Sequence, residues 1–145
     1  MENVLQKEII SWNKSFETGN PVVDGQHKNL FKMINDLNVS IEEGRSNYVL
    51  AETIEKLSVY ITIHFNTEED LMVKNFYPDY QIHKQAHSDL KEQAAKLIKL
   101  FCLKKVDLTA TISQFLSDWL QHHIKETDVK LIEWLRVKKI NVVTD

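Results

Sequence analysis

Four long segments of the sequence carry apolar residues at intervals of three and four, with few helix-breaking residues inside them. This spacing puts the apolar side chains on one face of an α-helix. Only three glycines and two prolines occur in 145 residues, which is too few for the many tight turns of a β-fold. The predicted helices cover about residues 22–43, 48–75, 78–103 and 108–138.

Short runs of turn-forming residues separate these segments, which makes consecutive helices antiparallel neighbours. The sequence therefore predicts an all-α fold, an up-down-up-down antiparallel four-helix bundle. Residues 1 to about 20 form an N-terminal arm, and Trp12 and Phe16 indicate that this arm lies over the bundle. A length of 145 residues suits one core, so residues 1–145 are expected to form a single domain.

Charge and cysteine content exclude several classes of protein. The net charge of −3 offers no basic footprint for nucleic acid. No apolar run is long enough to predict membrane insertion, and the N-terminus is too polar for a signal segment. The single cysteine, Cys102, rules out an intrachain disulfide and suits a reducing compartment, so we expect a cytoplasmic protein. A monomer is expected, with an oligomer left open.

The apolar stripes are interrupted by residues of the kinds that bind metals. A single histidine on such a stripe is more often a hydrogen-bonded core residue. Two buried carboxylates without a neighbouring Lys or Arg would be costly, however, and a metal cation both neutralises them and accepts imidazole lone pairs. The seven interrupting residues lie on all four segments: His27, His64, Glu68, His83, His87, His123 and Asp128.

The spacing of these residues supports one common site. The two histidines of the third segment, and the histidine and glutamate of the second, are four residues apart and so share a helix face. His123 and Asp128 are five apart, which in an α-helix puts them about 140° apart around the axis. They are therefore expected to reach the site from different angles. His122 shares its face with charged residues and is predicted to lie at the surface, with Asp118 as its candidate partner.

Counting donors indicates two metal ions. Five imidazoles and two carboxylates are too many for one ion. With both carboxylates and one solvent oxygen bridging two octahedral ions, the donors fill eleven of twelve positions and leave one open for a small ligand. Mixed nitrogen and oxygen donors favour iron, or manganese, over four-coordinate structural zinc. Ferritin-type sites use Glu-x-x-His pairs, and the stripes contain none.

Three stretches resemble the hemerythrin family, and in particular its single-domain bacterial members. "VVDGQHKNLFKMINDL" is similar to the family's first helix with its lone histidine. "HFNTEEDLMVKNFYPDYQIHKQAH" matches the family's central block almost position for position. "FLSDWLQHHIKETD" resembles the final helix, with Trp four residues before the ligand histidine and Asp five after it. The resemblance covers nearly the whole chain.

The resemblance implies two iron ions, Fe2+ or Fe3+, joined by a bridging oxo or hydroxo group and by Glu68 and Asp128. It implies a coordinatively full iron held by His83, His87 and His123. It implies a second iron, with the open position, held by His27 and His64. A dry pocket without a proton donor would keep O2 binding reversible. The residues expected to line it lie within a turn of a ligand: Leu30, Phe31, Phe65, Trp119 and Ile124.

The function implied by this resemblance is reversible O2 binding for storage, transport or delivery, without enzymatic turnover. Two alternatives use the same site. One is a di-iron oxidase, peroxidase or nitric-oxide-handling enzyme, although the stripes supply no extra buried acid or base to cleave an O–O bond. The other is a module that senses oxygen, redox state or nitric oxide through a partner.

Overall fold

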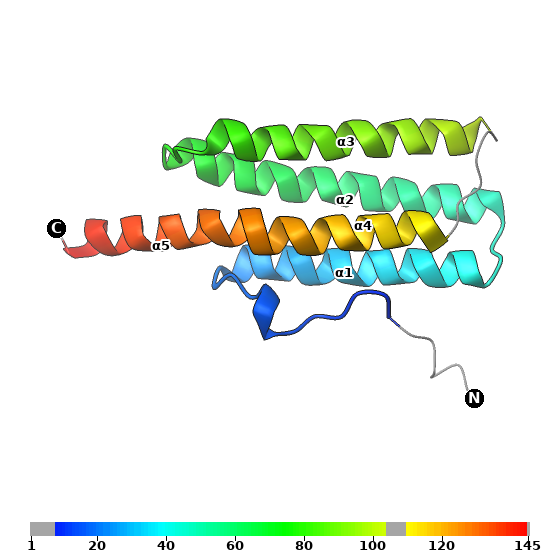
Figure 1. Cartoon of the computed structure of the whole chain (residues 1–145), viewed down its shortest axis with the longest axis horizontal. Coiled ribbons are helices and arrows are strands. Elements are labelled where there is room, and N and C mark those ends of the chain that lie inside the picture. Colours follow the sequence, from blue (N-terminus) through cyan, green and yellow to red (C-terminus); the bar gives the residue numbers. More distant parts are fainter. Residues whose placement is uncertain (1–7, 104–109, 145) are drawn as a thin grey trace.

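The computed structural model describes residues 8–103 and 110–144. Within this part of the chain, four helical rods lie side by side (Figure 1). The first three rods are α1 (Pro21–Glu42), α2 (Asn47–Lys74) and α3 (Tyr80–Cys102). The fourth rod is made of α4 (Ala110–His123), the π-helical turn η3 (Ile124–Asp128) and α5 (Val129–Thr144).

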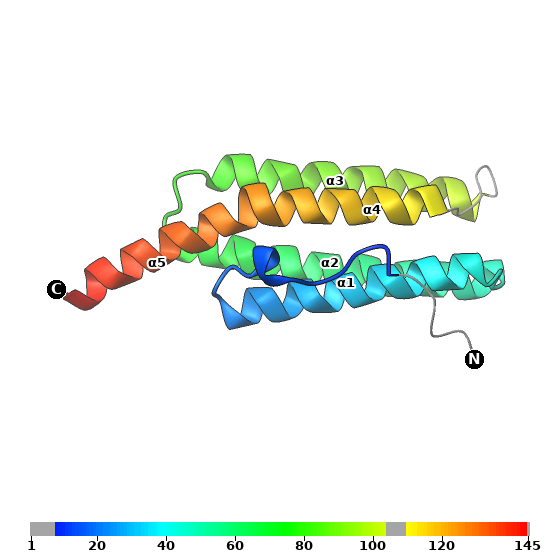
Figure 2. The same cartoon turned by 60° about the horizontal axis from the view of Figure 1, so that its bottom comes forward.

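Successive rods run in opposite directions, as the colours of Figure 1 show. Helix α1 packs against α2 and α4, and α2 packs against α3. Figure 2 shows α1 with α2 in one layer and α3 with α4 in the other. The all-α, up-down-up-down bundle with an N-terminal arm is therefore confirmed. The fourth rod continues to Thr144, beyond the predicted 138, and its predicted start at 108 lies outside the described residues.

Local signals explain where the first two helices begin and end. The Asn20 side chain accepts hydrogen bonds from the first free backbone N–H groups of α1, and Pro21 occupies the first helical position, where no N–H partner is needed. Ser46 caps α2 in the same way. Gly44 takes the left-handed conformation, with φ of 69°, which lets the chain reverse between the two helices.

The N-terminal arm is held against α1 by hydrogen bonds and aromatic packing. The backbone N–H groups of Ile9 and Ile10 donate to the Asn35 side-chain oxygen at 2.9 and 3.2 Å, and Asn35 donates back to the Ile10 carbonyl at 2.8 Å. The rings of Trp12 and Phe16 lie 5.2 and 5.0 Å from the ring of Phe31. The arm therefore covers one side of the bundle (Figure 2).

Apolar residues form two core clusters, with a polar layer between them. The larger cluster includes Leu30, Leu37 and Ile124, and the smaller one includes Val23 and Leu131. The predicted donor residues fall in sequence between the two clusters, except His123, which directly precedes Ile124 of the larger cluster. This order encloses the polar layer in apolar packing. Among residues 8–103 and 110–144, no helix combines the length and apolar character that crossing a membrane requires.

Candidate metal centre

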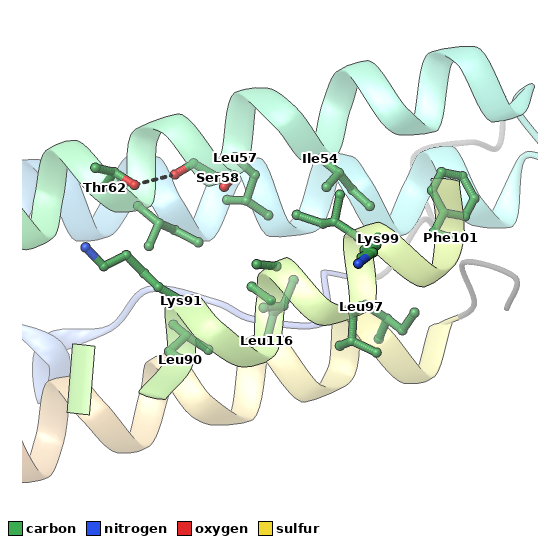
Figure 3. Close-up of a pocket in the computed structure, with 15 residues that line it drawn as sticks. Ile54, Leu57, Ser58, Thr62, Leu90, Lys91, Leu97, Lys99, Phe101 and Leu116 are labelled. Atoms are coloured by element: carbon green, nitrogen blue, oxygen red, sulfur yellow. Dashed lines mark hydrogen bonds between the residues drawn. The ribbon is translucent and has the colours of Figure 1, made fainter. Parts of the chain in front are cut away.

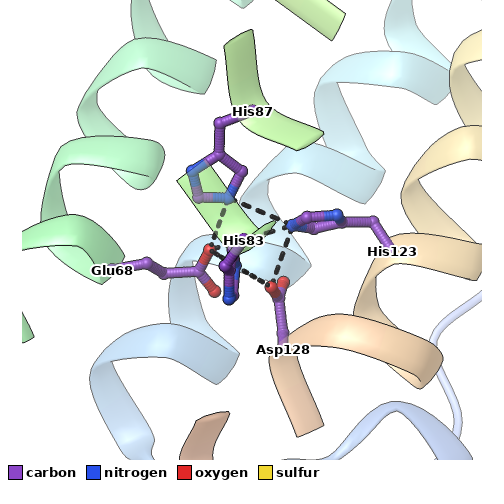
Figure 4. A group of neighbouring side chains, drawn as sticks. All are labelled: Glu68, His83, His87, His123 and Asp128. Atoms are coloured by element: carbon purple, nitrogen blue, oxygen red, sulfur yellow. Dashed lines mark hydrogen bonds and ion pairs between the residues drawn. The ribbon is translucent and has the colours of Figure 1, made fainter. Parts of the chain in front are cut away.

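All seven predicted donors converge inside the bundle and are almost completely buried, with at most 3% of any of these residues exposed. They form two groups, and within each group the potential ligand atoms lie within 4.8 Å of one another. The first group, drawn in Figure 4, consists of Glu68, His83, His87, His123 and Asp128. The second consists of His27, His64, Glu68 and Asp128. The two groups therefore share both carboxylates.

Glu68 turns its two oxygens in different directions. Oε1 lies 3.3 Å from Nε2 of His83 and 3.1 Å from Nε2 of His87, in the first group. Oε2 lies 3.5 Å from Nε2 of His64, in the second group. One carboxylate thus offers one oxygen to each group of imidazoles.

Asp128 is arranged in the same way from the fourth rod. Its Oδ1 lies 3.1 Å from Nε2 of His83 and 3.0 Å from Nε2 of His123. Its Oδ2 lies 2.8 Å from Nε2 of His27. Two carboxylates that each span both groups are suited to bridge a pair of adjacent cations.

The π-helical turn η3 explains how His123 and Asp128 reach the same place. The Val129 N–H bonds to the Ile124 carbonyl, five residues earlier, so this turn holds one residue more than an α-turn. Residues five apart then lie above one another. The expected separation of about 140° around the axis is therefore wrong, because it assumed α-helical geometry throughout. Such turns occur often at functional sites.

Two of the imidazoles are oriented by hydrogen bonds on their far side. His64 Nδ1 lies 2.7 Å from the Gln26 side-chain oxygen, and Gln26 in turn donates to the Thr67 hydroxyl at 3.0 Å. His87 Nδ1 lies 2.9 Å from a Glu69 oxygen. Since an amide or carboxylate oxygen only accepts, each Nδ1 carries the proton and each Nε2 keeps its lone pair for a metal.

Sequence reasoning did not identify Gln26 and Glu69. Each is next in sequence to a predicted ligand, at the edge of an apolar stripe. A polar residue there is ordinarily read as part of the solvated face. A ligand histidine usually donates its other ring N–H to a second polar residue. A search for such a partner near each predicted ligand is the one approach that could have found Gln26 and Glu69.

The electrostatics of the cluster fit a cation. Glu68 Oε2 and Asp128 Oδ1 are buried atoms without a hydrogen-bond partner among the described residues. Burial raises the pKa of Glu68, and the neighbouring charge of Asp128 raises it further. Burial, with His123 and His83 close by, lowers the pKa of His87 to about 2, so this imidazole is neutral near pH 7. Imidazoles around two carboxylates are a donor set for hard or borderline metal ions.

Aromatic rings cover two of the histidines. Phe65 stacks on His87 with ring centroids 3.7 Å apart, and Trp119 stacks on His123 at 4.5 Å. Leu30 joins Phe65 and Trp119 in lining a small apolar cavity beside the polar layer.

Two other residues expected in the pocket are placed differently. Phe31 packs against Trp12 and Phe16 of the arm, and Ile124 is fully buried beside His123. The role of all five residues as pocket walls stays a prediction.

Comparison with known proteins agrees with this geometry. The family model described as "Hemerythrin HHE cation binding domain" matches residues 18–135. The chain belongs to the hemerythrin family. It is 31% identical to the bacteriohemerythrin of Methylococcus capsulatus over 121 residues, which cover 83% of this chain and 92% of the relative. It is 34% identical to the myohemerythrin of Theromyzon tessulatum over 123 residues, which cover 85% of this chain and 91% of the relative.

A solved structure shows the same fold. A crystal structure of wild-type hemerythrin superposes with a TM-score of 0.80 at 30% sequence identity, covering 83% of this chain and 92% of that one. The buried histidine and carboxylate cluster of this hemerythrin-family chain is consistent with a di-iron site.

His122 is a surface residue in this hemerythrin-family chain. It directly precedes the buried His123, yet its own side chain is exposed. Its expected partner, Asp118, instead accepts a hydrogen bond from Gln114 at 2.9 Å. His122 therefore offers a control position beside a candidate ligand.

Proposed function

We propose that this chain binds O2 reversibly at a non-haem di-iron centre, for oxygen storage, transport or delivery. The observation that supports this proposal most is the double role of Glu68 and Asp128. Each carboxylate presents one oxygen to each histidine group, which is the arrangement needed to bridge two ions. Family membership makes iron the ion that we propose.

The two groups differ in their number of imidazoles, and this difference defines the proposed roles. We assign one iron to the three histidines His83, His87 and His123, and the other to His27 and His64. Glu68, Asp128 and an oxo or hydroxo group would bridge them. When bound, two ferrous ions would supply the electrons that O2 accepts and the open position that it occupies. We place the open position on the iron assigned to His27 and His64, because this group has one nitrogen donor fewer.

The chain's own residues keep the site dry. The small cavity beside the polar layer is lined only by apolar and aromatic side chains, among them Leu30, Phe65, Trp119 and Leu120. None of these carries a titratable group that could deliver a proton to a bound ligand. Apolar core clusters lie on both sides of the layer. Such surroundings favour release of unchanged O2 over its reduction.

The test is stopped-flow spectroscopy of the reduced, iron-loaded protein mixed with O2 and then evacuated. A visible absorption band that forms and disappears repeatedly supports reversible binding. Continuous O2 consumption with one-way oxidation would instead support the oxidase or peroxidase alternative. If the purified protein held at most one iron per chain under iron-replete conditions, the di-iron proposal would be wrong.

We further propose that the protein acts as a monomer in the cytoplasm. A single cysteine suits a reducing compartment. Sedimentation of the purified protein, and fractionation of cells that express it, test these two points separately.

A further inference from the structure

A second cavity lies between α2, α3 and α4, in the half of the bundle that holds the larger core cluster (Figure 3). Its volume is about 450 Å³, within the range of small-molecule sites. Its lining is apolar except for four residues, Ser58, Thr62, Lys91 and Lys99. The donor residues of the metal centre do not line it.

The cavity exists because the helices do not fill this seam with their own side chains. Helix α3 presents two small residues, Ala94 and Ala95, where larger ones would close the space. As a result Ile61, Leu97 and Leu116 remain only half-buried, although they lie on the apolar stripes. An apolar guest would remove this surface from water and gain the dispersion contacts that are missing.

Two lysines give the cavity a positive rim. Lys91 and Lys99 lie two turns apart on α3, and both line the cavity. Among the described residues, neither forms an ion pair with a carboxylate. In Figure 3 the Lys91 side chain extends toward the part of α2 that carries Thr62. An anionic group at the end of an apolar guest would therefore meet an ammonium group that no described carboxylate neutralises.

We propose that this cavity binds a single-chain amphiphile with an anionic head, of the medium-chain carboxylate class. The alkyl chain lies along the apolar seam past Ala94 and Leu116, and the carboxylate pairs with Lys91. The proposal does not depend on O2 binding at the metal centre.

The size of the cavity favours one alkyl chain over a helix from a partner. An alkyl chain is far narrower than an α-helix, which is about 10 Å across with its side chains, so it can enter a seam lined by three packed helices. The lysine rim also favours a charged amphiphile over a neutral hydrocarbon. A second copy of this chain would instead bring further lysines to the same seam.

Titration calorimetry of the purified, iron-loaded protein tests the proposal, with dodecanoate and the neutral dodecanol as probes. We expect saturable binding of one dodecanoate per chain below its micelle concentration, about three- to fivefold tighter than dodecanol. Lys91→Met should weaken the binding of dodecanoate by about the same factor and leave the binding of dodecanol unchanged. Lys96→Met, an exposed α3 lysine outside the cavity lining, is the matched control and should change neither.

A filling variant tests the location. Ala94→Phe should abolish binding of both probes while helix content and iron content stay those of the parent. If circular dichroism shows that this variant does not fold, Ala95→Leu takes its place. Three results would overturn the proposal: no saturable binding to the parent, unchanged binding in the filled variant, or equal affinity for the two probes. A dimer in sedimentation that the filling variant dissociates would assign the seam to a second copy instead.

Discussion

Glu68 on α2 and Asp128 at the end of the π-helical turn share one arrangement: in each carboxylate, one oxygen faces the first histidine group and the other faces the second. Both side chains are fully buried, and no Lys or Arg pairs with them among the described residues. Burial raises the pKa of Glu68, whereas the histidines around Asp128 outweigh burial and lower its pKa. A cation between the two carboxylates would let both keep their charges. Their pairing therefore leads to the predictions about metal binding.

Replacing His64 with Ala should remove one of the two nitrogen donors of the second group. We expect the variant to bind about one iron per chain in place of two, and to lose reversible O2 binding. Iron assay and absorption spectroscopy measure both effects. His122→Ala is the control, because the His122 side chain is exposed. Equal behaviour of the two variants would contradict the assignment of helix faces.

Glu68→Gln should separate metal binding from folding. The amide has one oxygen and no charge, so it cannot bridge two cations, and iron content should fall below one per chain. The iron-free protein should be no less stable than its parent, because burial raises the pKa of Glu68 and the neutral amide avoids the cost of a buried charge. Denaturant unfolding of both iron-free proteins measures this, with the exposed Glu126→Gln as control. A destabilised iron-free variant with normal iron content would refute the bridging role.

Gln26→Leu should weaken metal binding without touching a ligand. It removes the acceptor for His64 Nδ1, 2.7 Å away, and so frees the ring to rotate or change tautomer. Loss of such a partner costs about 10- to 100-fold in metal affinity. Chelator competition measures it. Gln26→Glu keeps an acceptor oxygen and should retain most of the affinity, whereas an equal loss in both variants would point to packing alone.

Asn35→Leu should detach the N-terminal arm. Asn35 makes three hydrogen bonds to the backbone of Ile9 and Ile10, and its loss leaves part-buried backbone groups unpaired. We expect the free energy of unfolding to fall by about 1–3 kcal/mol. Denaturant unfolding measures the loss, and hydrogen exchange should show faster exchange at these two amides. Asp36→Ala, at an exposed neighbouring position paired only with Lys32, should cost less than about 1 kcal/mol.

Leu30→Asn should make the proposed oxygen site wet. Leu30 is 2% exposed and lines the small cavity with Phe65 and Trp119. A polar amide there can hold water, which would donate protons and speed one-way oxidation in air, by about tenfold or more. The decay of the oxygenated spectrum measures this rate. Leu30→Met keeps the cavity apolar and should leave the rate within about twofold; equal rates in both variants would argue against dryness as the cause.

The helical period made much of the donor set predictable. His83 and His87 lie four apart on an apolar face, so their common direction follows from helix geometry alone. The same reasoning separated the buried His123 from the exposed His122. Gln26 and Glu69 could not be found this way. Each forms a hydrogen bond with a histidine on another helix, and the period of one helix does not report on such contacts.

The order of polar and apolar residues along the chain determined four rods, their antiparallel arrangement and the faces that carry seven ligand-type side chains. Tertiary structure decided the rest. The π-helical turn aligned His123 with Asp128, and the packing of α1 on α2 brought Gln26 to His64. The physical reason is the range of the forces involved. Local periodicity fixes which way a side chain points, whereas ångström-scale distances between donors depend on how four separate helices pack together.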